Sequence, residues 1–92
     1  MNNNFMSANN YYQHKYGGLY RMITKCKHAD TKEDMIVYEH MYPFDKQTYV
    51  RNQSEFFEKF KPITNDQYEQ LLLLNKYEMQ QLINNNKRNT IS

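Results

Sequence analysis

The sequence is poor in the residues that cross-link or interrupt a chain. It has no tryptophan, one cysteine, two glycines and two prolines in 92 residues. A single cysteine, Cys26, cannot form an intrachain disulfide, which excludes the cross-linked secreted scaffolds and indicates a reducing compartment. With so few glycines, the adjacent pair Gly17 and Gly18 predicts a turn, because glycine adopts positive φ without steric cost.

Long apolar runs and an excess of charge are also missing. The longest apolar run, Leu71–Leu74, is far shorter than the roughly 18 residues of a membrane-spanning helix, and the Asn-rich start does not resemble a signal peptide. We therefore expect a cytoplasmic protein with no membrane partner. The formal net charge of +2 is too small to indicate a nucleic-acid partner by itself. The abundance of Asn, Lys, Tyr and Ile is typical of an AT-rich genome, such as that of a phage or a low-GC bacterium.

Tyrosine is abundant, with nine tyrosines and five phenylalanines concentrated in the middle of the chain. We predict a β-rich domain over 11–63, with strands at 11–14, 19–28, 35–42 and 47–51 from their alternation and their aromatic and β-branched residues. The flanking arm, 1–10, and tail, 85–92, are polar and predicted to be disordered. The predicted fold class is α+β: a small, strongly bent antiparallel sheet or SH3-like barrel followed by one long C-terminal helix.

Two local features refine this picture. Asn52 is expected to cap a short helix over 53–59, which would place Phe56, Phe57 and Phe60 over an open end of the sheet. In the strand 19–28, the two-residue period puts alternate side chains on one mainly apolar face, which we expect to point inward: Tyr20, Met22, Thr24, Cys26 and His28.

The C-terminal part is predicted to be one helix over 65–84, opened by a capping box between Thr64 and Gln67. Five positions follow the four-and-three spacing of a coiled-coil seam: Tyr68, Leu72, Asn75, Met79 and Leu82. One alternative is that this face packs on the chain's own sheet. The other is that it also builds a homo-oligomer, in which a seam asparagine sets the register.

Three motifs in order resemble the bacterial and phage family known as domain of unknown function 1653. The first is Tyr12-Gln-His14-Lys-Tyr-Gly17-Gly18-Leu-Tyr20, the second runs from Lys27-His28 through Met35-Ile36-Val37-Tyr38 to Met41-Tyr42, and the third is Tyr49-Val50-Arg51 with Phe56 or Phe57. The resemblance covers about residues 12–60. It implies a small bent sheet or barrel and supplies no reaction.

The polar aromatic residues of these motifs and their one cation form the candidate ligand-binding set: His14, Tyr20, Tyr38, Tyr49 and Arg51. Tyrosine rings stack on nucleobases and arginine binds phosphate bidentately, so a small barrel that gathers them would make a nucleotide or modified-base pocket. The alternative is that the tyrosines form the core and Arg51 pairs with Glu55 or Glu39.

Catalytic and metal chemistry have little support in the sequence. His14, Cys26, His28 and His40 are metal-ligand types, but no CxxC or HxxxH spacing joins them, so we predict no metal and no cofactor. The sequence also lacks a phosphate-binding loop and a dinucleotide fingerprint. We predict a non-catalytic module that binds a nucleotide, a nucleotide-derived signal or a modified base, sequestering a defence signal if the gene is phage-borne. The alternative is a protein–protein inhibitor or adaptor whose C-terminal helix docks on a host protein.

Overall fold

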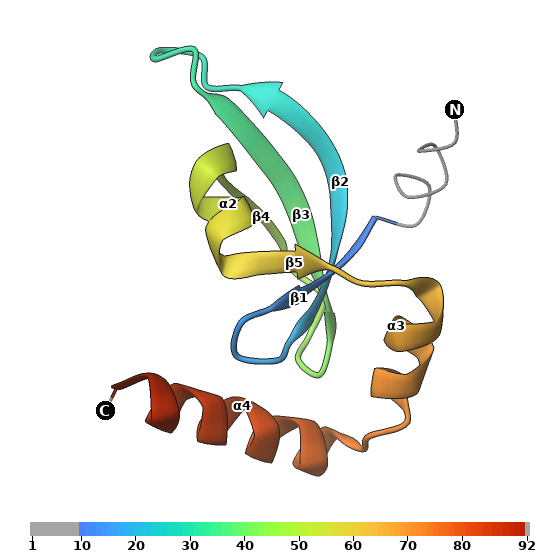
Figure 1. Cartoon of the computed structure of the whole chain (residues 1–92). Helices are drawn as coiled ribbons and strands as arrows, with labels where there is room; N and C mark the ends of the chain where they lie inside the picture. Colours follow the sequence, from blue (N-terminus) through green and yellow to red (C-terminus); the bar gives the residue numbers. More distant parts are fainter. Residues whose placement is uncertain (1–9, 92) are drawn as a thin grey trace.

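The computed structural model describes residues 10–91 and shows an α+β fold (Figure 1). Five antiparallel strands form one sheet: β1 Tyr11–His14, β2 Leu19–Lys27, β3 Asp34–Tyr42, β4 Thr48–Asn52 and β5 Phe60–Pro62. Three helices accompany it: α2 Gln53–Lys59, α3 Asn65–Leu72 and α4 Lys76–Ile91. Apart from Asn10, the predicted N-terminal arm lies outside the described residues.

The sheet is open, with the strand order β4-β3-β2-β1-β5 and with β4 and β5 at its edges. Strand β5 was not predicted; it pairs with β1, His14 lying opposite Phe60. Two register shifts interrupt the β2–β3 ladder, between Leu19 and Tyr20 and between Met22 and Thr24. Such irregularities bend a strand and increase its twist. Accordingly, Figure 1 shows β2 and β3 curving as a long hairpin away from β1 and β5.

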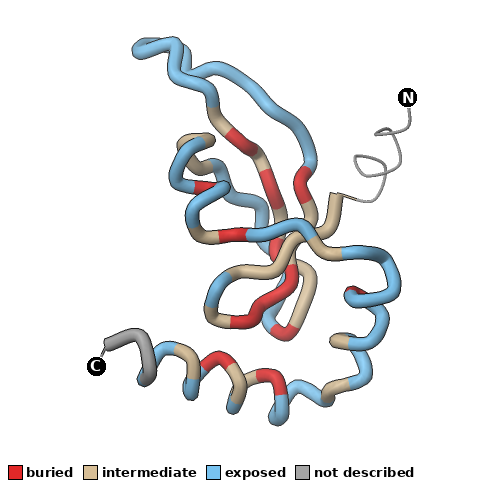
Figure 2. The backbone as a smooth tube through the Cα atoms, viewed as in Figure 1, coloured by how far each residue is buried: buried red, intermediate tan, exposed pale blue. Residues whose placement is uncertain are grey.

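The inward face expected for β2 is found only near its start. Tyr20 is half-buried and Met22 is buried, but Thr24, Cys26 and His28 are exposed. The prediction is wrong for these three because the register shift between Met22 and Thr24 interrupts the two-residue alternation. Met22 pairs with Tyr38 but Thr24 pairs with Val37, so Thr24 and Cys26 lie on the other face, and His28 lies beyond the end of β2. In addition, β1 pairs with β2 only as far as Arg21, and beyond that residue none of the described strands lies along this edge of β2. Figure 2 shows the hairpin tip as exposed.

One core cluster lies where α2 meets the sheet, and its buried members are Met22, Ile36, Tyr38, Phe56 and Phe60. The rings of Phe56 and Phe60 stack with centroids 4.4 Å apart. The predicted cap holds, since the Asn52 side chain accepts a hydrogen bond from the Ser54 amide at 2.9 Å. Phe57 is 44% exposed, so, contrary to the prediction, it does not cover the open end of the sheet.

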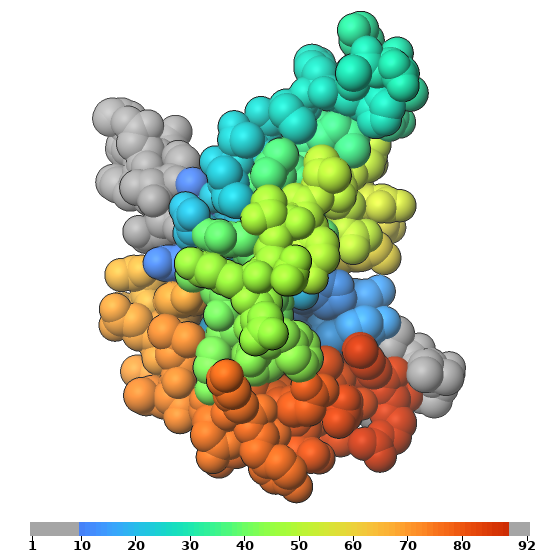
Figure 3. Space-filling view, turned by 180° about the vertical axis from the view of Figure 1, so that it is seen from behind, coloured from blue at the N-terminus to red at the C-terminus, as the bar shows by residue number. Residues whose placement is uncertain are grey.

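A second cluster joins α3 and α4 to the sheet, with Leu19, Tyr68, Met79 and Ile83 as its buried members. The rings of Tyr11 and Tyr68 stack with centroids 3.8 Å apart, and the Tyr42 hydroxyl donates to the Leu74 carbonyl at 2.6 Å. Figure 3 shows α4, in red, packed against the turns that follow β1 and β3. The C-terminal helices therefore cover one end of their own sheet.

The prediction of one long C-terminal helix is wrong, because α3 ends at Leu72 and α4 begins at Lys76. Asn75 explains the break. Its side chain accepts from the Glu78 amide at 2.8 Å, and the Glu78 carboxylate accepts from the Asn75 amide at 3.0 Å. This reciprocal pair is a capping box, so Asn75 starts a new helix instead of continuing a seam. Helix α4 then runs to Ile91, through residues predicted to form a disordered tail.

Candidate ligand-binding site

All five residues of the predicted ligand-binding set line one cavity of about 150 Å³, together with Phe60. Every strand contributes: β1 carries His14, β2 carries Tyr20, β3 carries Tyr38, β4 carries Tyr49 and Arg51, and β5 carries Phe60. The two edge strands face each other across this cavity, since the Arg51 Cζ lies 6.0 Å from the centroid of the Phe60 ring. The bend of the sheet therefore brings together residues far apart in the sequence.

The rings of the cavity meet mainly edge to face. Tyr20 packs at 87° to Phe60 with centroids 5.0 Å apart, and at 61° to Tyr38 with centroids 5.7 Å apart. Tyr38 is only 3% exposed and forms the inner wall, whereas Tyr49 is 46% exposed and lies at the rim. An exposed tyrosine face beside a buried aromatic wall is a surface on which a planar ring can stack.

Arg51 is held at the cavity by two neighbours. Its Nε donates to the Tyr38 hydroxyl at 3.1 Å and its Nη1 to Glu55 at 3.5 Å. The hydrogen bond with Tyr38 is the main cause of a raised pKa for the guanidinium. The contact with Glu55 is long and partly exposed, so it adds little to stability, and Glu39 pairs instead with Arg21 at 2.6 Å. Among residues 10–91, the hydrogen bonds of the Arg51 side chain go to Tyr38 and Glu55, which leaves other N–H groups of the guanidinium for an anion.

His14 is neutral at pH 7. Desolvation, followed by the positive charges of Arg51 and three lysines, lowers the pKa of His14 to about 4. Its Nδ1 accepts from the Tyr16 amide at 3.1 Å, so the proton of the neutral imidazole is on Nε2. Burial also favours the neutral form of Tyr20: it raises the pKa of Tyr20 to about 12, which keeps the hydroxyl protonated. The site thus offers neutral donors beside a permanent cation.

A second cavity of about 240 Å³ adjoins the first, and the two share His14 and Tyr20. Its other lining residues are Tyr16, Gly18, Phe44, Ile83 and Lys87. Gly18 keeps this region open, because a Cβ there would lie 3.2 Å from the Tyr20 ring and 3.5 Å from the His40 ring. Sequence reasoning missed these residues. Lys87 lies in the segment predicted to be a tail. Phe60, which lines the first cavity, was expected over the open end of the sheet but not in the ligand-binding set, and its strand of three residues is too short to show a period.

The predicted seam residues are separated by the break between α3 and α4. Tyr68 and Met79 are buried and Leu82 is half-buried, all three in the second core cluster. Leu72 is 39% exposed, and Asn75 caps α4. Within one chain, the face therefore packs on its own sheet.

The other histidines serve turns. His28 Nδ1 accepts from the amides of Asp30 and Thr31, and His40 Nε2 accepts from the Phe44 amide at 2.9 Å. Among the described residues, no three His, Cys, Asp or Glu side chains gather as metal ligands. None of the helices described here is long and apolar enough to cross a membrane.

A bent five-stranded antiparallel sheet, closed at one side by α2 and lined inside by rings and one guanidinium, defines a small α+β domain with an aromatic concavity. The chain belongs to the family described as "Protein of unknown function (DUF1653)", whose model matches residues 10–70. The match spans all five strands, α2 and most of α3, and confirms the resemblance seen in the motifs. Neither the curated proteins nor the solved structures gave a match.

Proposed function

We propose that this protein is a non-catalytic binding module for an anionic ligand with a planar ring, such as a nucleotide, a nucleotide-derived signal or a modified base. One observation carries the proposal: every strand of the sheet brings a ring or the guanidinium to the same concavity. Sequestration of a defence signal remains one use of such a module.

The chemistry of the lining matches such a ligand in three ways. The Tyr49 face can stack on a base, a contact worth roughly 1–3 kcal/mol. The free donors of Arg51 suit a phosphate, and the neutral donors of His14 and Tyr20 suit the edge of a ring. The cavity of about 150 Å³ is small for a whole nucleotide, but with its neighbour of about 240 Å³ it reaches the roughly 300–1,000 Å³ of ordinary ligand pockets.

The same geometry supports a small SH3-like barrel as the finer description of the sheet. An open flat sheet would hold its edge strands far apart, whereas here Arg51 on β4 lies 6.0 Å from the Phe60 ring on β5. An experimental structure in which β4 and β5 diverge would contradict both the barrel and the pocket.

Replacing Arg51 with alanine is expected to weaken binding of a phosphate-bearing ligand by about tenfold to hundredfold, because charge-assisted hydrogen bonds contribute roughly 1.5–3 kcal/mol. Calorimetry against a panel of nucleosides and nucleotides measures this. Arg51 is on the surface of the cavity, so circular dichroism should show an intact fold.

Arg21→Ala is the matched control. Arg21 neighbours Tyr20 in β2, so its side chain lies on the opposite face of the sheet, where it pairs with Glu39. This variant removes the same charge and should bind as the wild type does. Absence of heat with every member of the panel would overturn the proposal, and equal binding by Arg51→Ala would remove Arg51 from the site.

An adaptor role is the second candidate, favoured by the apolar residues at the turn between α3 and α4. Leu73 is 77% exposed and Tyr77 is 72% exposed, a pair that a protein partner would cover. The double variant Leu73→Ser, Tyr77→Ser should lose a partner captured from host cells while it retains nucleotide binding. Affinity purification with mass spectrometry tests this, and an unchanged set of captured proteins would rule the surface out.

A further inference from the structure

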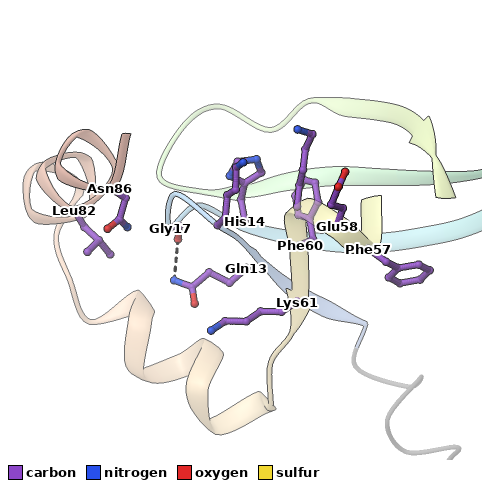
Figure 4. Close-up of a pocket in the computed structure, with 11 residues that line it drawn as sticks. Gln13, His14, Gly17, Phe57, Glu58, Phe60, Lys61, Leu82 and Asn86 are labelled. Atoms are coloured by element: carbon purple, nitrogen blue, oxygen red, sulfur yellow. Dashed lines mark hydrogen bonds between the residues drawn. The ribbon is translucent and has the colours of Figure 1, made fainter. Parts of the chain in front are cut away.

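A cavity of about 440 Å³ lies between the β1–β5 edge and α4 (Figure 4). Figure 4 shows Gln13 and Lys61 extending side by side toward Leu82 and Asn86 of α4, while the Phe57 ring points away from the other end. His14 lines this cavity, the aromatic cavity and the cavity that adjoins it. The imidazole is therefore a wall common to all three.

Lysines gather around His14, and within residues 10–91 none of them forms an ion pair with a carboxylate. Lys15, Lys59 and Lys61 line the large cavity, with Glu58 as its one acidic group, and Lys87 lines the adjoining cavity. Among residues 10–91, the recorded ion pairs join other side chains: Arg21–Glu39, Lys27–Asp34 and Arg51–Glu55. Lys15, Lys59 and Lys87 also help Arg51 to lower the pKa of His14. A bound anion would offset the mutual repulsion of these lysines and Arg51.

The backbone fixes two of these lysines together. The Lys15 amide donates to the Lys59 carbonyl at 2.8 Å, which joins the end of β1 to the end of α2. Helix α4 supplies the facing wall. It sits close to the turn after β1, since a Cβ on Gly17 would lie 3.2 Å from Leu82, and Asn86 Nδ2 donates to the Tyr16 carbonyl at 2.8 Å.

We infer that the ligand carries several phosphates, which lie beside Lys15 and Lys59 in the cavity under α4, while its ring lies in the aromatic cavity beyond His14. This inference rests on the proposed function and specifies the ligand as a nucleoside di- or triphosphate or a compound with a comparable oligophosphate. Ammonium groups are compact donors for phosphate oxygens, and several of them suit a chain of phosphates better than a single one. Because α4 lies outside residues 10–70, this wall is an addition to the family-matched part of the chain.

Calorimetry with a nucleoside and its mono-, di- and triphosphate tests the inference, with inorganic triphosphate as a probe that lacks the ring. Affinity should rise by about tenfold with each phosphate that gains a lysine contact, and inorganic triphosphate should bind weakly. The double variant Lys15→Gln, Lys59→Gln should remove this gain in affinity per phosphate and abolish binding of inorganic triphosphate. Both lysines are partly or fully exposed, so the fold should remain.

The control is Lys25→Gln, Lys32→Gln, which makes the same change in net charge on the β2–β3 hairpin, away from the cavities. It should bind the whole series as the wild type does. A monophosphate that binds as tightly as the triphosphate would overturn the inference and leave the proposed function standing. If the nucleoside, every nucleotide and inorganic triphosphate gave no heat of binding, both the inference and the proposed function would be overturned. Equal losses in the two double variants would also overturn the inference, since net charge alone would then explain binding.

Discussion

Replacing Phe56 with alanine is expected to lower the free energy of unfolding by about 3–5 kcal/mol. Phe56 is fully buried, stacks on Phe60 at 4.4 Å, and packs its ring against Tyr38 at 5.0 Å and Tyr12 at 5.1 Å. Its removal leaves a cavity where α2 covers the sheet, and the surrounding rings are held by their own strands and cannot collapse to fill it. Domains of this size have only about 5–15 kcal/mol of stability, so a large part of it should be lost.

Urea denaturation followed by circular dichroism measures this loss, and Phe57→Ala provides the control. Phe57 is the next residue of α2, has the same side chain and is 44% exposed. Its replacement should therefore cost much less than that of Phe56. Similar urea midpoints for Phe56→Ala and Phe57→Ala would show that α2 does not cover the core of the sheet through Phe56. The Phe56 substitution should also weaken ligand binding, because Tyr38 and Phe60 line the aromatic cavity.

Replacing Met79 with alanine is expected to cost about 2–5 kcal/mol of the free energy of unfolding. Met79 is fully buried in the second cluster, beside Leu19, Tyr68 and Ile83. A helix as short as α4, Lys76–Ile91, is marginal by itself in water, so its position depends on this packing. The loss should be concentrated in the C-terminal part of the molecule.

Hydrogen exchange resolves this effect by segment. In Met79→Ala, amides of α4 should exchange faster than in the wild type, while those of β3 should change less. Tyr77→Ala, at a position of α4 that is 72% exposed, is the control and should leave exchange nearly unchanged. Unaltered protection of α4 in Met79→Ala would contradict the packing of this helix on the sheet, and with it the wall of the lysine-lined cavity.

The strands and caps were predictable because their signals are local. Alternation and aromatic content located β1 to β4 within a residue or two, and Asn52 and Thr64 were recognised as caps from their side chains alone. The break before α4 carries a local signal as well, Asn75 followed three residues later by Glu78. It was missed because the apolar spacing around Asn75 also fits an uninterrupted seam.

The contents of the candidate site were predictable in part. The family motifs singled out five residues that the structure places in one cavity, but not Phe60, which belongs to a strand of three residues. The lysine-lined cavity had no signal at all. Its residues come from β1 and the turn after it, α2, β5 and α4. The pairing of β1 with β5 brings the first three groups together, and the packing of α4 against the turn after β1 adds the facing wall.

The sequence by itself determined that the chain is an α+β domain of its family, with strands, caps and a tyrosine-rich centre, because these follow from side-chain chemistry at short range. The tertiary structure alone decided which faces are covered, where the helices pack and which distant side chains share a cavity. The physical reason is that burial depends on the neighbours that a bend brings near. Two register shifts in β2 curl the sheet until its edge strands meet across the rings, and the capping box at Asn75 turns α4 back under them.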